Sequence, residues 1–288
     1  MISSNTDLYC IFGKPVKHSK SPVIHNAWFE QYKINAAYLA FETDNISSAV
    51  TAMKALNIKG ASVTIPYKES VMDCLDHIDK NALKIGAVNT IVNSDTKLTG
   101  FNTDFMAAIE PLKHFGIKNK KVCIIGAGGA ARAVAHGIKE NRGRLVIINR
   151  SIEKGKTLAL KYDAGFISMD EINKKGEFEA DIIINTTPVG MYPDIKVSPF
   201  PSRLLNKRMI VMDIIYNPLK TRLLIEAQNR GCTTVDGLSM FMHQGAAQFE
   251  LWTGITPEIN IAQEAILYSA RPKTTNLPNY GVGKNQIL

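Results

Sequence analysis

The stretch "KVCIIGAGGAARAVAHGI", residues 121–138, decides the fold class of this chain. An apolar run of strand length leads into a glycine cluster, and a helical pattern follows it. Gly126, Gly128 and Ala131 match the spacing G-x-G-x-x-A. In that pattern the first glycine permits a tight turn, the second lets the backbone approach a pyrophosphate, and the alanine allows close packing of helix on strand. Free N–H groups at the helix start would receive the phosphates. A glycine-rich turn without a ligand is the alternative.

The next strand-like run, "RLVIIN" at 144–149, indicates which dinucleotide would bind. An acid at this strand end normally contacts the ribose hydroxyls of NAD. This chain instead has Asn149 and Arg150, followed by Ser151 and Lys154. A guanidinium can pair with a 2′-phosphate through two parallel bonds, whereas an acid would repel it. The pattern predicts NADP(H). The alternative is a solvated Arg150 opening a helix over 152–161, which the helix dipole mildly disfavours.

Strand-like and helical segments alternate along the whole chain, and this predicts an α/β fold with mainly parallel sheets. The remaining strands are expected at 8–12, 36–41, 60–65, 86–92, 181–186, 209–215 and 232–236, and helices at 22–33, 46–57, 104–115, 129–141, 152–161 and 219–230. The character of the sequence changes near 101–119 and again near 237–239, after which helices continue to about 270. Residues 271–288, rich in Pro, Gly and Asn, are expected to form a disordered tail.

Composition narrows the class of function. A chain of 288 residues with 45% hydrophobic and 21% charged residues is typical of a globular enzyme. The net charge of +8 suits anionic small molecules, but no clustered run of Lys and Arg predicts a nucleic-acid partner. The four cysteines form no C-x-x-C pair, so neither a metal site nor a disulfide framework is expected. An apolar run of about eighteen residues and a secretory leader are both lacking, which predicts no membrane partner and a cytoplasmic location.

Polar residues gather at the ends of the strand-like runs in the first third of the chain. Ser19 and Ser21 follow the first run, at a place where ligands commonly bind in open α/β sheets. Ser21 before Pro22 would also serve as a helix N-cap, which would explain it without a ligand.

The segment "GASVTIPYKES" at 60–70 places Ser62 and Thr64 on one face of an expected strand. Lys68 is then expected at the start of a helix, the electrostatically unfavourable end for a cation. A solvated lysine is the alternative.

Three further segments bring polar groups into apolar surroundings. Asn89 and Thr90 interrupt a strand, and Asp104 within "NTD" at 102–104 could simply cap the next helix. Tyr216 follows a later strand. Gln244 and Gln248 lie four residues apart, on one face of an expected helix.

In chain order these segments resemble the shikimate dehydrogenase family, from about residue 8 to 268. The most specific pieces are "HSKSP", "VTIPYKE", "GAVNT", "NTD", "GAGGAARA", "NRS", "INTTPVGM", "YNPLKT" and "MHQGAAQFELW". The resemblance implies two domains around a cleft: a discontinuous substrate domain of 1–103 plus 239–270, and a Rossmann-like NADP domain of 104–238. It also implies reversible, NADPH-dependent reduction of 3-dehydroshikimate to shikimate, a step of chorismate and aromatic amino acid biosynthesis.

The resemblance also assigns residues. Ser19 and Ser21 would hold the substrate carboxylate, Tyr216 would lie near it, and the hydroxyls and ring oxygen would contact Thr64, Lys68, Asn89, Asp104 and Gln244. Lys68 and Asp104 would form the catalytic pair without a metal, since an ammonium can stabilise and protonate the developing oxyanion. The residues assigned to NADP are Gly126, Gly128, Gly129, Ala130, Asn149, Arg150, Ser151, Lys154, Thr187, Ile214 and Gly237.

The chain departs from the family pattern at a few positions. Ala107 replaces a common Gly, and Phe241 and Met242 replace smaller aliphatics. Lys154 replaces an Arg near the 2′-phosphate. Ser62 replaces an Asn and would change one edge of the substrate pocket, which leaves room for a related acid such as quinate.

Two alternatives therefore stay open. One is a quinate/shikimate dehydrogenase or a relative acting on an amino analogue, and the other is a non-catalytic NADP-binding sensor. A small-molecule partner and a monomer or homodimer are expected.

Overall fold

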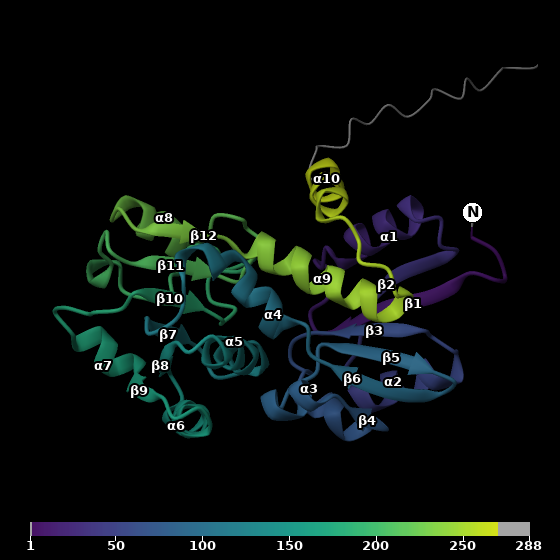
Figure 1. Ribbon diagram of the computed structural model, residues 1–288, viewed down its shortest axis with the longest axis horizontal. Helices are drawn as coiled ribbons and strands as arrows, with labels where there is room; N and C mark the ends of the chain where they lie inside the picture. Colours follow the sequence, from purple (N-terminus) through teal and green to yellow (C-terminus); the bar gives the residue numbers. More distant parts are fainter. Residues whose placement is uncertain (1, 270–288) are drawn as a thin grey trace, which may run out of the picture.

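The computed structural model describes residues 2–269 and contains two six-stranded sheets, one from each half of the chain. The expected tail at 271–288 lies outside the described residues. Figure 1 shows the sheets side by side along the long axis of the molecule, with helix α9 (Gly237–Thr253) extending from one to the other. The α/β fold predicted from the sequence is confirmed.

The first sheet is mixed. Its order is β2 (Ala36–Glu42), β1 (Asp7–Gly13), β3 (Gly60–Val63), β5 (Thr90–Ser94), β6 (Lys97–Phe101) and β4 (His77–Ile78). β2, β1 and β3 are parallel, whereas β5 pairs antiparallel with both β3 and β6. The β5–β6 hairpin turns at Asp95 and Thr96, both with positive φ, as the twist of a two-residue hairpin loop requires.

The second sheet is parallel throughout. Its order is β12 (Thr233–Val235), β11 (Ile210–Asp213), β10 (Ile182–Asn185), β7 (Lys121–Ile125), β8 (Arg144–Asn149) and β9 (Gly165–Ser168). The chain leaves β7 toward β8 and later returns to β10 on the other side of β7. The carboxyl end of β7, where the glycine cluster begins, is therefore the topological switch point, the usual ligand position in such sheets.

Helices cover both sheets. They are α1 (Ser21–Gln31), α2 (Ile46–Ala55), α3 (Lys80–Ile85), α4 (Asp104–Ile109), α5 (Gly129–Glu140), α6 (Ile152–Lys161), α7 (Met169–Lys174), α8 (Arg222–Asn229), α9 and α10 (Ile259–Ser269), with 3-10 turns at Ser70–Cys74, Glu110–Phe115 and Ser202–Leu204. No helix among residues 2–269 has the length and apolarity needed to cross a membrane.

Successive residues of a central strand point alternately into two hydrophobic cores, one on each face of the sheet. This holds for both sheets. In β1, Tyr9 and Ile11 pack toward α1 and α9, whereas Cys10 joins the core on the opposite face with α2. In β7, Ile124 packs with α5 and Cys123 with α8 on the other face. This period of two on both faces explains why the central strands are almost entirely apolar. All four cysteines are free.

Several expected boundaries are wrong. The strand expected at 86–92 begins only at Thr90. The helix expected over 104–115 ends at Ile109 and continues as a 3-10 turn containing Pro111, which lacks the N–H that an α-helix needs. The helix expected from 219 begins at Arg222, because Thr221 caps it by accepting the N–H of Leu224. β3 ends at Val63 instead of continuing to residue 65.

Candidate functional site

A lysine–aspartate pair lies between the two sheets. Lys68 Nζ is 2.6 Å from Asp104 Oδ2, and the side chains are 17% and 5% exposed. Lys68 lies in the turn after β3, and Asp104 is the first residue of α4. Asp104 Oδ1 accepts a second hydrogen bond, from Asn89 Nδ2 at 2.8 Å. Both carboxylate oxygens are thus engaged, which fixes the direction in which the ammonium approaches.

Two structural explanations suggested by the sequence for this pair do not hold. Asp104 does not cap a helix: the N-cap of α4 is Thr103, and no side chain caps that helix. Asn102 Oδ1 instead accepts the N–H of Asp104 and leaves the carboxylate free for Lys68. Lys68 does not begin a helix either, because the 3-10 turn starts at Ser70, so the argument from the helix dipole does not apply.

Asn89 links the pair to the first sheet. Its Oδ1 accepts from the hydroxyl of Thr90 at 2.7 Å and from the backbone N–H of Thr103 at 2.8 Å. Its Nδ2 donates to Thr103 Oγ1 as well as to Asp104. With its side chain almost fully buried and every amide group bound, Asn89 holds Asp104 in one orientation.

The serines of the first loop lie together with Tyr216. Ser19 Oγ donates to Ser21 Oγ at 3.1 Å and accepts the N–H of Ser21. Ser21 does not act as the expected N-cap: Lys20 is at that position, and no side-chain cap forms. Burial raises the pKa of the Tyr216 phenol, partly offset by hydrogen bonding with the Lys20 backbone and Ser19. Tyr216 stacks on Phe241, with ring centroids 4.1 Å apart.

Thr64 and Gln244 are both partly exposed. The backbone N–H of Thr64 donates to the carbonyl of Phe12, which places Thr64 at the carboxyl ends of β1 and β3. Gln244 Nε2 donates to the carbonyl of Phe241, and the carbonyl of Gln244 accepts the hydroxyl of Thr103. α9 is therefore tied to the residue that precedes Asp104.

The glycine cluster forms the turn expected after β7. Gly126 has φ +121°, and a Cβ there would lie 2.5 Å from Thr186 Oγ1, so only glycine fits. A Cβ on Gly128 would meet nothing within 4 Å, which means that the backbone there faces open space. Gly129 opens α5, and its Cβ would lie 3.0 Å from Lys68 Cβ. The cofactor motif and the lysine–aspartate pair are thus direct neighbours.

The other residues assigned to the cofactor border the carboxyl end of the second sheet. Thr187 Oγ1 donates to Asn185 Oδ1 at the end of β10. A Cβ on Gly237 would lie 2.4 Å from the carbonyl of Ile214, so the start of α9 approaches the end of β11 closely. Ala130 is half-buried in the first turn of α5.

The cations after β8 are exposed. Ser151 caps α6 by accepting the N–H of Lys154, and Asn149 Nδ2 donates to the carbonyl of Ser151. Arg150 and Lys154 form no hydrogen bond or ion pair through their side chains within the part of the chain that the structure describes. Both cationic groups are therefore available to an anion at this strand end.

Two polar contacts join the halves beside the pair. Arg132 of α5 forms an ion pair of 3.0 Å with Glu69, the residue that follows Lys68. Lys161, at the end of α6, donates to the carbonyl of Ile85 at 3.0 Å.

The sequence suggested that Ser62 forms one edge of the substrate pocket, but its hydroxyl is not free to do so. It is 4% exposed, and its hydroxyl is bound by Tyr38 and Gln248. Tyr38 was not identified from the sequence as part of the site. The four-residue spacing of Gln244 and Gln248 on α9 was the available signal for Gln248.

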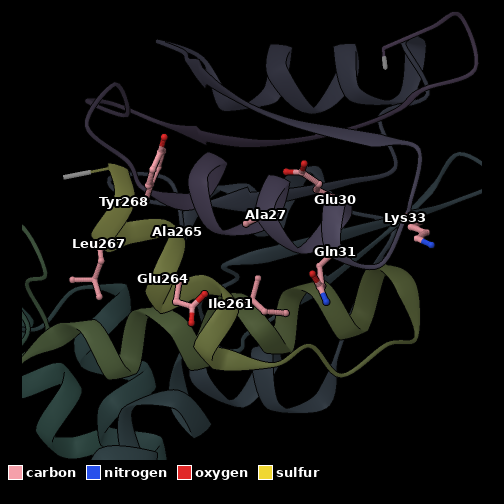
Figure 2. Close-up of a pocket in the computed structure, with 9 residues that line it drawn as sticks. All are labelled: Ala27, Glu30, Gln31, Lys33, Ile261, Glu264, Ala265, Leu267 and Tyr268. Atoms are coloured by element: carbon pink, nitrogen blue, oxygen red, sulfur yellow. The ribbon is translucent and has the colours of Figure 1, made fainter. Parts of the chain in front are cut away.

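A separate hollow of about 870 Å³ lies between α1 and α10 (Figure 2). It is lined by Ala27, Glu30, Gln31, Lys33, Ile261, Glu264, Ala265, Leu267 and Tyr268. None of the residues predicted for substrate or cofactor belongs to it, so it plays no part in the site.

Sequence profiles cover most of the chain. Residues 11–91 match the shikimate dehydrogenase substrate binding domain, 110–215 match shikimate / quinate 5-dehydrogenase, and 237–267 match the shikimate 5'-dehydrogenase C-terminal domain. A curated relative from Pyrococcus abyssi, shikimate dehydrogenase (NADP(+)), is 43% identical over 90% of this chain and 97% of its own. The chain belongs to the shikimate dehydrogenase family.

Solved structures of shikimate dehydrogenases have the same fold. One, in complex with NADP+, is 41% identical with a TM-score of 0.86 and covers 94% of this chain and 98% of its own. Another, from Thermus thermophilus in complex with NADP(H) and shikimate, is 32% identical with a TM-score of 0.83, over 92% of this chain and all of its own.

Proposed function

We propose that this chain is an NADP-dependent shikimate dehydrogenase that reversibly reduces 3-dehydroshikimate to shikimate, a step of chorismate and aromatic amino acid biosynthesis. The main observation behind this proposal is the Lys68–Asp104 pair, which is held by Asn89 and lies against Gly129 of the glycine turn. A proton donor next to the cofactor motif is what a dehydrogenase needs where its substrate meets the cofactor, and this supports the proposal. Membership of the shikimate dehydrogenase family supports the same activity.

The residues present fit NADP(H). The backbone at Gly128 is open to a pyrophosphate, and Gly128 is the N-cap of α5 without a side-chain cap. Arg150 and Lys154 would hold the 2′-phosphate, with Asn149 and Ser151 between β8 and α6. Thr187, Ile214 and Gly237 would line the nicotinamide side.

The roles of the residues follow from their chemistry. Bound NADPH supplies a hydride to the substrate ketone. Lys68 stabilises the negative charge that builds on the ketone oxygen and gives that oxygen a proton; in the reverse direction it accepts the proton. Its ammonium has three N–H donors and one is used by Asp104, which leaves others for the substrate.

The neighbouring groups position the substrate. Asp104 orients Lys68 and accepts a substrate hydroxyl, while Asn89, Thr64 and Gln244 contact the other polar groups. Ser19, Ser21 and Tyr216 hold the carboxylate. A preorganised set of this kind lowers the barrier, because little rearrangement is needed as charge develops.

Quinate is the second candidate substrate, because the matched family profile covers both shikimate and quinate dehydrogenases. A non-catalytic sensor remains the alternative from another class. The complete Lys68–Asp104–Asn89 set argues against it, since binding NADP alone does not require a proton donor aimed at a second ligand.

A matrix of shikimate and quinate against NADP and NAD tests the proposal. We expect the highest kcat/KM with shikimate and NADP, and loss of NADPH absorbance on adding 3-dehydroshikimate. A higher kcat/KM with quinate would favour the second candidate. NADPH binding without turnover of any of these acids would favour the sensor.

We also propose the domain division 1–103 plus 239–270 and 104–238. It is supported by the two separate sheets and by α9, whose Gln248 and Trp252 donate to residues of β5. The cytoplasmic location, and a monomeric or homodimeric state, stay predictions.

A further inference from the structure

A buried line of hydrogen bonds runs from Tyr38 through Ser62 and Gln248 toward the Lys68–Asp104 pair. The Tyr38 hydroxyl donates to Ser62 Oγ at 2.6 Å, and the Ser62 hydroxyl donates to Gln248 Oε1 at 2.8 Å. Tyr38 and Gln248 are at most 1% exposed and Ser62 is 4% exposed. The three residues come from β2, β3 and α9, so the line joins the first sheet to the helix that crosses behind the site.

The line continues from Gln248 to the catalytic pair. Gln248 Nε2 donates to the carbonyl of Asn89 and to Thr90 Oγ1, both at 3.0 Å. The Thr90 hydroxyl donates to Asn89 Oδ1, and Asn89 Nδ2 donates to Asp104 Oδ1. Asp104 is the residue that holds Lys68.

Two backbone groups force every hydrogen bond in this line to point the same way. The N–H of Thr103 can only donate, so the atom of Asn89 that faces it is the amide oxygen, and Asn89 Nδ2 must face Asp104. The carbonyl of Asn89 can only accept, so the atom of Gln248 that faces it is the amide nitrogen. Gln248 Oε1 then faces Ser62, which must donate to it, and Tyr38 must donate to Ser62. Each group therefore has one orientation, and the line ends at the Asp104 carboxylate.

We propose that Tyr38, Ser62 and Gln248 are positioning residues, which direct the Thr90 hydroxyl toward Asn89, hold the Asn89 segment in place and thereby align Asp104 and Lys68 for proton transfer. This inference rests on the proposed function, since it concerns the same catalytic pair. None of the three residues contacts Lys68. Their effect is transmitted through Asn89, whose Oδ1 accepts the Thr90 hydroxyl beside the backbone N–H of Thr103.

Three variants test the line in order of distance from Asp104. Gln248→Leu removes both donors to the Asn89–Thr90 segment, Ser62→Ala removes the donor to Gln248, and Tyr38→Phe removes only the first donor. We expect kcat to fall by about 10- to 100-fold in Gln248→Leu, less in Ser62→Ala and least in Tyr38→Phe. The KM for NADPH should stay unchanged in all three. Near-normal kcat in a folded Gln248→Leu protein would overturn the proposal.

Asn93→Leu is the matched control. Asn93 is also a buried amide, on the same strand as Thr90, but it donates to the carbonyl of Ile58 and takes no part in the line. We expect this variant to lose thermal stability and keep its kcat. A loss of kcat in Asn93→Leu equal to that in Gln248→Leu would mean that general destabilisation accounts for both effects, which would contradict a positioning role.

Gln248→Glu gives a readout that a purely structural role would not change. A carboxylate there would face the Asn89 carbonyl and turn the Thr90 hydroxyl toward itself, away from Asn89 Oδ1. Protonation restores one donor, so we expect kcat of this variant, relative to wild type, to recover as pH falls. His25 is the titratable side chain that faces Gln248, and burial lowers its pKa to about 3 in the wild-type protein. A ratio of kcat values that does not change with pH would refute the one-way arrangement, even if Gln248→Leu fails to fold.

Turnover of 3-dehydroshikimate by the wild-type protein distinguishes a failure of the proposed function from a failure of the positioning role. If wild type does not turn over, the proposed function fails, and the role in proton transfer fails with it. If wild type is active while the folded Gln248 variants match it in kcat and pH profile, only the positioning role fails.

Discussion

Gly129, the first residue of α5, lies directly against Lys68: a Cβ on Gly129 would be 3.0 Å from Lys68 Cβ and 3.4 Å from its Cδ. The helix that begins at the glycine turn therefore contacts the stem of Lys68. The Arg132–Glu69 ion pair lies one turn further along α5 and fastens the residue after Lys68. The position of the ammonium thus depends on both halves of the molecule.

Gly129→Ala should displace Lys68. Contacts of 3.0 to 3.4 Å are tight, so the lysine must shift by a few tenths of an ångström. We expect kcat to fall by about 3- to 10-fold, since catalysis is sensitive to small misplacements. Gly176→Ala is the control, because a Cβ at Gly176 meets nothing within 4 Å. Steady-state kinetics of both variants would check this, and equal kcat in the two would contradict it.

Lys68→Ala should abolish nearly all turnover, with a loss of at least about 100-fold in kcat, because it removes the group that we propose to stabilise and protonate the oxyanion. Binding of NADPH, followed by fluorescence titration, should survive, since the glycine turn and Arg150 are untouched. A rate close to wild type would refute the catalytic role of Lys68.

Arg150→Ala should raise the KM for NADP by about 10- to 100-fold, because a hydrogen bond to a charged group contributes about 1.5 to 3 kcal/mol. The KM for shikimate should change little. Initial rates with each substrate varied in turn would measure both constants. Comparable changes in the two would mean that Arg150 supports the domain instead of the 2′-phosphate.

Asp213 should make folding less favourable as pH rises. Burial raises its pKa from 3.8 to about 6, although Ile215, Thr221 and Asn185 donate hydrogen bonds to it. The folded protein thus binds this proton more tightly than the unfolded chain, and stability is lost as pH rises from about 4 to about 6.

Asp213→Asn should remove that loss. It should be more stable than wild type above pH 6 by up to about 3 kcal/mol, and similar to wild type near pH 4. Urea unfolding at both pH values would measure the difference, with the exposed Asp194→Asn as control. The same difference in the free energy of unfolding at both pH values would contradict the prediction.

His25 should make the folded protein less stable as pH falls, the opposite of the effect of Asp213. Burial lowers its pKa from 6.5 to about 3, and the neighbouring Gln248 side chain offsets only part of this shift. Below pH 6.5 the unfolded chain takes up a proton that the folded protein does not, so stability is full above pH 6.5 and falls as pH drops toward 3. His25→Leu should therefore lose about 2 kcal/mol less than wild type between pH 7 and pH 5 in unfolding experiments. Parallel losses in the two proteins would contradict the prediction.

Local signals made much of the second half predictable. The bounds expected for the helix at 152–161 are those of α6, because Ser151 is an N-cap and the apolar residues repeat with helical period. The turn at Gly126 could also be predicted, since the glycine spacing encodes its backbone.

The first half was harder because several of its elements depend on neighbours. The two-residue turn at Asp95 and Thr96 lacks glycine, so β6 was missed. Asp104 had the appearance of a helix cap in the sequence, yet its carboxylate binds Lys68, 36 residues earlier in the chain.

The sequence by itself determined the α/β class, the glycine turn and the cations after β8, because each follows from residues adjacent in the chain. Only the tertiary structure decided that Gly129 contacts Lys68, and that Ser62 bonds Gln248 across 186 residues instead of lining the pocket. Such contacts depend on the order of strands in a sheet and on how a helix crosses it, and no local period of the sequence encodes either.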